Sequence, residues 1–206
     1  MQFVYNGTDE RKEKGLLSLS RIAWGKPSRQ WEINQAGGIE LYLQLVANGT
    51  NGQKAAATKA LRNLALSNPR KQTATARAGA IELLLDLVRT GTEEQKSDAV
   101  TALGTLAKKN QPIQDAIAAS GGIELSIELL GVGTDDQISR AASTLGALSE
   151  RNEANRMAVT YAGGLGLIAQ FKARSKHLDR EMAETALHIL NSRYYYIGDR
   201  RNIPNK

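Results

Sequence analysis

The residues best suited to chemistry in this chain lie in or beside a largely apolar stretch, ALRNLALSN at 60–68. Lys59 and Arg62 carry positive charge, and the carboxamide of Asn63 can both donate and accept a hydrogen bond. Asparagine is a mediocre helix former, so its place among Ala and Leu residues at helical spacing needs a reason. These side chains can hold an anion or a peptide unit.

Catalysis and metal binding find little support in the sequence. The chain has no cysteine, which excludes disulfides and thiolate sites. We expect His177 in a loop and His188 on the last helix, and without other ligands near them we expect no metal and no cofactor. No nucleophile, base and orienting acid form a set, so we expect no catalytic residue and no enzyme.

Composition favours packing of helix on helix. Of the 206 residues 41% are hydrophobic and only 5% aromatic, while Ala and Leu are abundant. The start lacks the regions of a signal peptide, and no apolar run approaches the ~20 residues of a membrane span. We therefore expect an intracellular protein, cytoplasmic or nuclear, with an organelle left open if a presequence was removed.

The sequence repeats itself every 42 residues without insertion or deletion. Gly-Thr recurs at 7–8, 49–50, 91–92 and 133–134. Glycines follow in the same phase at Gly37, Gly79, Gly121 and Gly163, and so do leucines at Leu19, Leu61, Leu103, Leu145 and Leu187. A fixed period of this length indicates an array of stacked units.

Each unit reads as three helices. In 68–109, Asn-Pro starts a short helix that stops at Gly79, and a middle helix follows and stops at Gly91. Thr92 and Gln95 then form a capping box that starts a longer helix. The same box recurs at Thr50 with Gln53 and Thr134 with Gln137, whereas Thr8 is followed by Arg11 and keeps only the cap.

These units predict an all-α fold, a right-handed α-solenoid in which stacking buries the apolar faces. We expect a partial unit at 1–25 that holds a lone third helix. Four units of about 42 residues follow, at 26–67, 68–109, 110–151 and 152–192. Residues 193–206 break the pattern and form a basic, Tyr-rich tail.

The unit resembles the armadillo repeat, with "AGGI" before the second helix and "ALRNLA" in the third. Beta-catenin and importin alpha are well-known members. The resemblance implies that third helices line a concave groove, where a ladder of asparagines often binds the backbone of an extended peptide. Asn63 falls on this ladder, so the groove would explain it. The alternative is an asparagine that is bonded within its own array.

The other ladder positions depart from the family pattern, since they hold Arg21, Thr105, Ala147 and Ile189. One turn earlier, where importin alpha typically has tryptophan, the chain has Leu17, Lys59, Thr101, Ser143 and Thr185. The tryptophan and asparagine array of nuclear import receptors is absent, so we do not expect that function.

The resemblance and helical spacing together predict a partner-binding groove that is basic and rich in small hydroxyls. Its candidate residues are Arg21, Trp24, Lys59, Arg62, Asn63, Thr101, Thr105, Lys108, Arg140 and Ser143. An acidic or phosphorylated extended segment would suit it through charge-assisted bonds. The alternative is a face of solvated lysines and arginines.

Charge is uneven along the chain. Residues 26–67 contain five basic and two acidic residues, whereas 110–151 contain two basic and six acidic ones. Nucleic acid would favour an uninterrupted basic stripe with stacking aromatics. Binding of nucleic acid through the basic half of the groove therefore stays a less favoured alternative.

The ends offer further contacts. In the tail, Tyr194, Tyr195, Tyr196, Arg200 and Arg201 could close the solenoid or dock into a partner. At the start, Phe3, Val4 and Tyr5 could cover Leu16 and Leu17. The sequence thus predicts a non-enzymatic scaffold that binds protein in its groove or at its ends. An architectural subunit of a large assembly is the alternative within that class.

Overall fold

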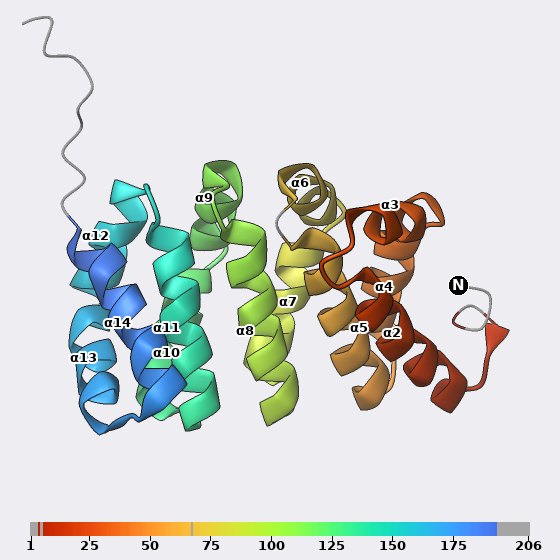
Figure 1. Ribbon diagram of the computed structural model, residues 1–206. Helices are drawn as coiled ribbons and strands as arrows, with labels where there is room; N and C mark the ends of the chain where they lie inside the picture. The colour runs from red at the N-terminus through yellow and green to blue at the C-terminus, as the bar shows by residue number, and fades with distance from the viewer. Residues whose placement is uncertain (1–3, 5, 67, 193–206) are drawn as a thin grey trace, which may run out of the picture.

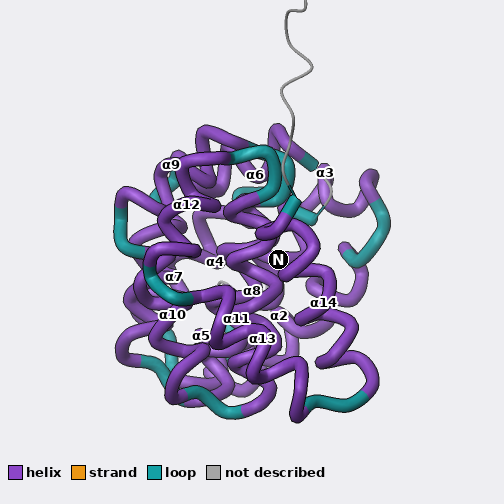
Figure 2. Tube along the Cα trace, turned by 90° about the vertical axis from the view of Figure 1, so that its left-hand side faces the viewer, coloured by secondary structure: helices purple, strands orange, loops and turns teal. Residues whose placement is uncertain are grey.

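The computed structural model describes residue 4 and residues 6–66 and 68–192 of the chain. This part consists of helices joined by short turns, and it contains no strand (Figures 1 and 2). The helices are α2 (Asp9–Ala23), α3 (Pro27–Gln35), α4 (Gly38–Asn48), α5 (Asn51–Ala65), α6 (Pro69–Arg77), α7 (Ala80–Thr90), α8 (Glu93–Ala107), α9 (Gln111–Ala119), α10 (Gly122–Val132), α11 (Asp135–Ser149), α12 (Glu153–Tyr161), α13 (Gly164–Arg174) and α14 (His177–Asn191).

The expected three-helix unit is confirmed. Helices of 9, 11 and 15 residues follow one another four times after α2, which stands as a lone third helix. The turn from the first to the second helix needs a left-handed residue, and glycine supplies it in every unit. Gly37, Gly79, Gly121 and Gly163 have φ of 76°, 91°, 86° and 80°.

The capping boxes are also confirmed, and they do more than start helices. Thr92 Oγ1 accepts from Gln95 N, and Gln95 Oε1 accepts from Thr92 N. Gln95 Nε2 then donates to Asn51 at the start of the preceding third helix, at 3.1 Å to its carbonyl oxygen. Equivalent bonds run from Gln53 to Asp9 and from Gln137 to Glu93, so each buried glutamine joins two units.

The third helices stand side by side as one layer (Figure 1). The first and second helices pack against this layer and leave one of its faces exposed. Figure 2 views the stack from the end where α14 lies. Small residues at this layer's interfaces, Ala57, Ala99 and Ala141, are fully buried, as expected for close helix approach. The leucines in phase, such as Leu61 and Leu103, form the continuous core.

At the N-terminal end, Leu16 is buried, and Val4 packs so closely on Gly15 that a Cβ there would lie 2.7 Å from Val4 Cγ2. Phe3 and Tyr5 lie outside the described residues. The predicted tail contacts Tyr194, Tyr195, Tyr196, Arg200 and Arg201 lie outside them as well. No helix within the described ranges combines the length and hydropathy required to span a bilayer.

Candidate functional site

The helices α2, α5, α8, α11 and α14 run parallel, and we call the exposed surface of this layer the third-helix face. Contacts between α11 and α14 show that these helices are parallel, because they follow the same order along both. Ser139 Oγ donates to Met182 Sδ, and further along a Cβ on Gly146 would lie 3.4 Å from Ala186 Cα. Thr144 Oγ1 also donates across the layer, to Val100 O at 2.8 Å. All the residues that the sequence predicted for the groove lie on these helices, except Trp24 and Lys108, which directly follow α2 and α8.

Asn63 is placed differently from the expectation. Its side chain is only 4% exposed, and Nδ2 donates to Ser20 Oγ at 2.7 Å and to Ser20 O at 3.2 Å. The prediction that this carboxamide faces the groove is wrong, because Ser20 on α2 offers two acceptors that draw it into the interface. The alternative, an asparagine bonded within its own array, describes the structure.

Arg62, one position earlier, keeps a guanidinium at the surface of the same helix. Its Cζ lies 6.0 Å from the ring centroid of Trp24, whose side chain is 56% exposed. Burial lowers the pKa of Arg62, although the charge of Asp98 opposes this effect. Among the described residues no carboxylate forms an ion pair with Arg62, and Arg21 nearby in the pattern is exposed.

Lys59 is held by two carboxylates of the next unit. Its Nζ lies 2.7 Å from Glu94 Oε1 and 3.3 Å from Asp98 Oδ2. Burial alone would lower the pKa of Lys59, but the bonds to Glu94 and Asp98 outweigh it and raise that pKa. Asp98 is 5% exposed, and burial raises its pKa despite the opposing charge of Lys59.

Arg140 pairs with a carboxylate of its own helix α11 and reaches back to the preceding third helix. Its Nε lies 2.8 Å from both carboxylate oxygens of Asp136, and Nη1 donates to Thr101 Oγ1 at 3.1 Å. Burial would raise the pKa of Asp136, but hydrogen bonds from Ser97 and Arg140 lower it overall. Thr101 is thus already engaged within the array.

These charged groups surround a shallow pocket of about 320 Å³ on the third-helix face. Its lining residues are Lys59, Glu93, Glu94, Ser97, Asp98, Thr134, Asp136 and Arg140. The prediction that this part of the groove is basic is therefore corrected, because acidic side chains lie among the predicted basic ones. Acidic residues in first helical turns were visible in the sequence, but their proximity to Lys59 and Arg140 depends on how neighbouring units stack.

The remaining predicted residues lie nearer the C-terminal ends of the third helices. Thr105 is half-buried and its Oγ1 donates to Thr101 O at 3.0 Å. Ser143 is exposed on α11, and Lys108 is exposed where α8 ends. Both retain side chains free to meet a ligand.

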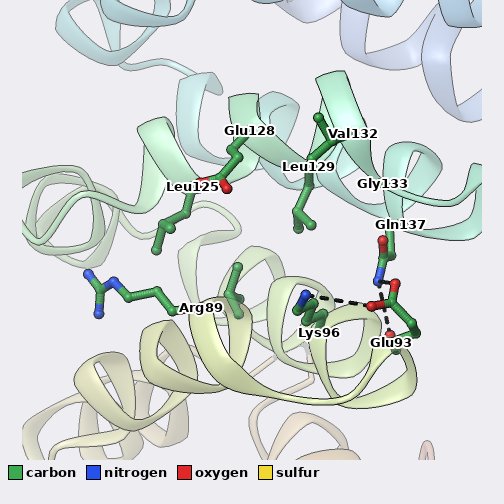
Figure 3. A pocket seen from close by; sticks show the side chains of 10 residues that line it. Arg89, Glu93, Lys96, Leu125, Glu128, Leu129, Val132, Gly133 and Gln137 are labelled. Atoms are coloured by element: carbon green, nitrogen blue, oxygen red, sulfur yellow. Dashed lines mark hydrogen bonds and ion pairs between the residues drawn. The ribbon is translucent and has the colours of Figure 1, made fainter.

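A second pocket, which the sequence did not indicate, lies between the second helices α7 and α10 (Figure 3). It has a volume of about 430 Å³ and an apolar wall that includes Leu125, Leu129 and the exposed Val132. Charged groups rim it, with Lys96 Nζ 3.5 Å from Glu93 Oε1. Within the described part of the chain, no cluster of three or more His, Cys, Asp or Glu residues could hold a metal ion.

Comparisons with known proteins agree on the fold. No protein-family model matches the chain, and neither does any curated protein. A designed armadillo repeat protein in complex with the peptide (KR)4 superposes with a TM-score of 0.83 at 19% identity, covering 92% of this chain and 80% of that one. An engineered protein gives a TM-score of 0.84 at 22% identity, with 91% and 78% covered.

A natural protein has the same architecture. ARO, the armadillo repeats only protein from Plasmodium falciparum, gives a TM-score of 0.71 at 16% identity and covers 87% of this chain and 80% of its own. Identities this low establish the fold alone. The expected armadillo repeat architecture is therefore confirmed.

Proposed function

We propose that this chain is a non-enzymatic protein-binding scaffold whose third-helix face binds an extended segment of a partner. The armadillo repeat architecture supports a role in protein binding. The solved complex of a designed armadillo repeat protein with (KR)4 supports it further, because that protein binds a peptide.

The observation that carries the proposal is the state of Arg62. Its guanidinium is half-buried over Trp24, and within the described residues it has no ion-paired carboxylate. A carboxylate or phosphate of a partner would bind it through charge-assisted hydrogen bonds, which are stronger than neutral ones. Exposed Arg21 and Lys108 add positive charge at other C-terminal ends of third helices. We therefore propose a partner segment with an acidic or phosphorylated residue near Arg62.

The neighbouring helices would hold the rest of such a segment. Thr105 on α8 presents a hydroxyl that donates to Thr101 O and can still accept from a main-chain N–H. The acidic side chains near Lys59 and Arg140 would repel a partner that is acidic along its whole length. The segment should therefore carry its negative charge at one end only, over α2 and α5.

A peptide array read by fluorescence anisotropy tests this function. It would contain extended peptides of one length that differ in having a single glutamate, phosphoserine, lysine or serine at one position. We expect glutamate and phosphoserine peptides to bind best and Arg62→Glu to weaken them at least tenfold. The matched control is Arg77→Glu on α6, an exposed arginine outside the face. Equal loss in both variants, or preference for neutral peptides, would contradict the proposal.

A second candidate, a fixed subunit of a larger assembly, is favoured by the N-terminal end of the array. Ile22 is 47% exposed, whereas Leu64, its equivalent one unit later, is 0% exposed. Trp31 on α3 is exposed as well. If this end joins another protein, Ile22→Glu should dissociate the complex with that protein in gel filtration, whereas Arg62→Glu should leave the complex intact.

Binding of nucleic acid is not favoured, since acidic residues interrupt the basic ones on the third-helix face. A steep loss of affinity for duplex DNA with rising salt would indicate such binding.

A further inference from the structure

The pocket of about 320 Å³ on the third-helix face carries more negative than positive charge. Its lining includes four carboxylates, Glu93, Glu94, Asp98 and Asp136, against the two cations Lys59 and Arg140. Although Glu93 also has Lys96 beside it, the ammonium of Lys59 must serve both Glu94 and Asp98. Arg62 and Arg140 also act on Asp98 through their charge, so the pocket lining itself holds two more carboxylates than cations, with Lys96 and Arg62 beside it.

Asp98 is the most deeply buried of these carboxylates, at 5% exposed, and its Oδ2 lies 3.3 Å from Lys59 Nζ. The side chains of Glu93, Glu94 and Asp136 are more than half exposed, so an incoming ligand would meet these three carboxylates. A buried carboxylate is costly unless donors surround it. The pocket has room for one more cationic group, and a guanidinium brings several donors at once.

The surface between this pocket and the C-terminal end of α14 is different in kind. On α14 it presents Thr185 and the partly exposed Ile189, and on α11 Ser143 and the partly exposed Ala147. These side chains are small or apolar and carry no charge. An extended segment that crosses from the end of α14 would meet them first and the carboxylates afterwards.

Residues 193–206 carry matching features in the same order. Tyr194, Tyr195, Tyr196 and Ile197 come first, and Arg200 and Arg201 follow. The segment contains four basic residues and one acidic residue. It continues directly from Ser192, which follows the last turn of α14.

The distance is within reach. An extended chain spans at most about 3.6 Å per residue, so Arg200 can lie up to about 29 Å from Ser192. A 15-residue helix is about 22 Å long. With about 10 Å between helix axes, the path to the first turn of α11 is about 24 Å and the path to the first turn of α8 is about 30 Å. Arg201 can lie up to about 32 Å from Ser192, so both turns are within reach.

We propose that residues 193–206 bind along the third-helix face, with the tyrosines over α14 and α11 and with Arg200 and Arg201 in the pocket at Glu93, Glu94 and Asp136. This goes beyond the proposed function, because it concerns a ligand within the chain and a different part of the face. Arg62 and Trp24 stay open to a partner, while the tail occupies the acidic half.

The absence of cysteine makes a direct test possible in the full chain. A nitroxide attached to Asn205→Cys should broaden the amide NMR signals of the first turns of α8 and α11, and ascorbate should restore them. Signals of α3 and α6 act as the internal reference. No broadening above that reference at α8 and α11 would overturn the proposal.

Charge variants test which residues hold the tail. Arg200→Gln with Arg201→Gln should remove the broadening. The matched control, Arg193→Gln with Lys206→Gln, lowers the tail charge equally and should preserve most of it. Equal effects of the two pairs would overturn the assignment to Arg200 and Arg201. None of these changes alters a residue of the described helices, so their packing is left intact.

A mixing experiment distinguishes the chain's own tail from that of a second copy. Isotope-labelled chain without nitroxide is combined with unlabelled chain that carries it. We expect no broadening of the labelled signals at dilute concentration. Broadening equal to that in the singly prepared sample would mean that the tail binds another molecule, which contradicts the proposal.

Discussion

Asn63 and Ser20 join the first two third helices through buried hydrogen bonds. Nδ2 of Asn63 lies 2.7 Å from Ser20 Oγ and 3.2 Å from Ser20 O, and the side chain of Asn63 is buried. On the same residue, the main-chain carbonyl accepts from Gln30 Nε2 at 2.9 Å. Asn63 therefore links α5 to α2 through its side chain and to α3 through its backbone.

Replacing the side chain of Asn63 should lower the free energy of unfolding and leave peptide binding unchanged. Asn63→Ala leaves two buried acceptors of Ser20 without their donor, so we expect the free energy of unfolding to fall by about 1–3 kcal/mol. Ser20→Ala removes only one acceptor and should cost less. Urea unfolding followed by circular dichroism measures both. If Asn63→Ala instead abolished peptide binding at unchanged stability, the structural role assigned to Asn63 would be wrong.

Two helical glycines provide a matched pair for the packing of third helices. A Cβ on Gly104 would lie 2.7 Å from Thr144 Oγ1 and 3.2 Å from Thr144 Cα, whereas a Cβ on Gly146 would find its nearest atom at 3.4 Å. Gly104→Ala should therefore force α8 and α11 apart and cost about 1–3 kcal/mol. Gly146→Ala meets ordinary contact distances, and the gain in helix propensity of up to about 1 kcal/mol should offset any loss.

Thermal unfolding of the two variants checks this expectation. The melting temperature should drop for Gly104→Ala and stay constant or rise for Gly146→Ala. Similar drops in both would show that the layer tolerates no added methyl group at all. Similar rises in both would show that the Gly104 contact is not tight.

Most of the fold could be predicted from the sequence because it depends on local signals that repeat. Gly79 stops a helix through its own backbone, and Thr92 with Gln95 starts one within four residues. Such signals need no knowledge of distant contacts. A constant period then fixes how the units stack, since each must bury the same face.

The site was harder to predict because it depends on the identity of the neighbour across an interface. Register placed Asn63 on the third helix of its unit correctly, but Ser20 decided where its carboxamide points. In the same way, Lys59 looked like a free cation until α8 brought Glu94 and Asp98 against it. Periodicity predicts where a residue stands along its helix, and it does not predict its partners 35 to 43 residues away.

Asp98 should make stability depend on pH. Burial raises its pKa in the folded protein, although Lys59, Arg62 and Arg140 lower it. A carboxylate with a raised folded pKa disfavours folding when it is charged. This penalty is present above the folded pKa, shrinks as the pH falls through that value and vanishes below the unfolded pKa.

Asp98→Asn isolates this contribution. We expect the variant to be more stable than the wild type at pH 7, and the difference to close as the pH falls below the ordinary range of aspartate. Urea unfolding at a series of pH values measures it. Asp86→Asn, an exposed change on α7, is the control for the loss of a carboxylate as such. A variant less stable than the wild type at pH 7 would mean that the ion pair with Lys59 outweighs burial.

Left-handed residues in the turns after third helices lead to the last prediction. Lys108 has φ −58° and ψ 114°, Lys109 has φ 57°, and Asn110 N donates to Ala107 O at 3.1 Å, as in a type II turn. The equivalent turn after α2 has Gly25 at φ 63°. Glycine adopts this conformation without the steric cost that a lysine meets.

Exchanging the residue types should therefore move stability in opposite directions. Lys109→Gly should raise the free energy of unfolding by up to about 1 kcal/mol, and Gly25→Ala should lower it by about 1 kcal/mol. A Cβ on Gly25 would meet no atom within 4 Å, so the loss would come from the backbone alone. Chemical denaturation resolves changes of this size. If Lys109→Gly destabilised the protein, the lysine side chain would have to make a contact that outweighs its strained backbone.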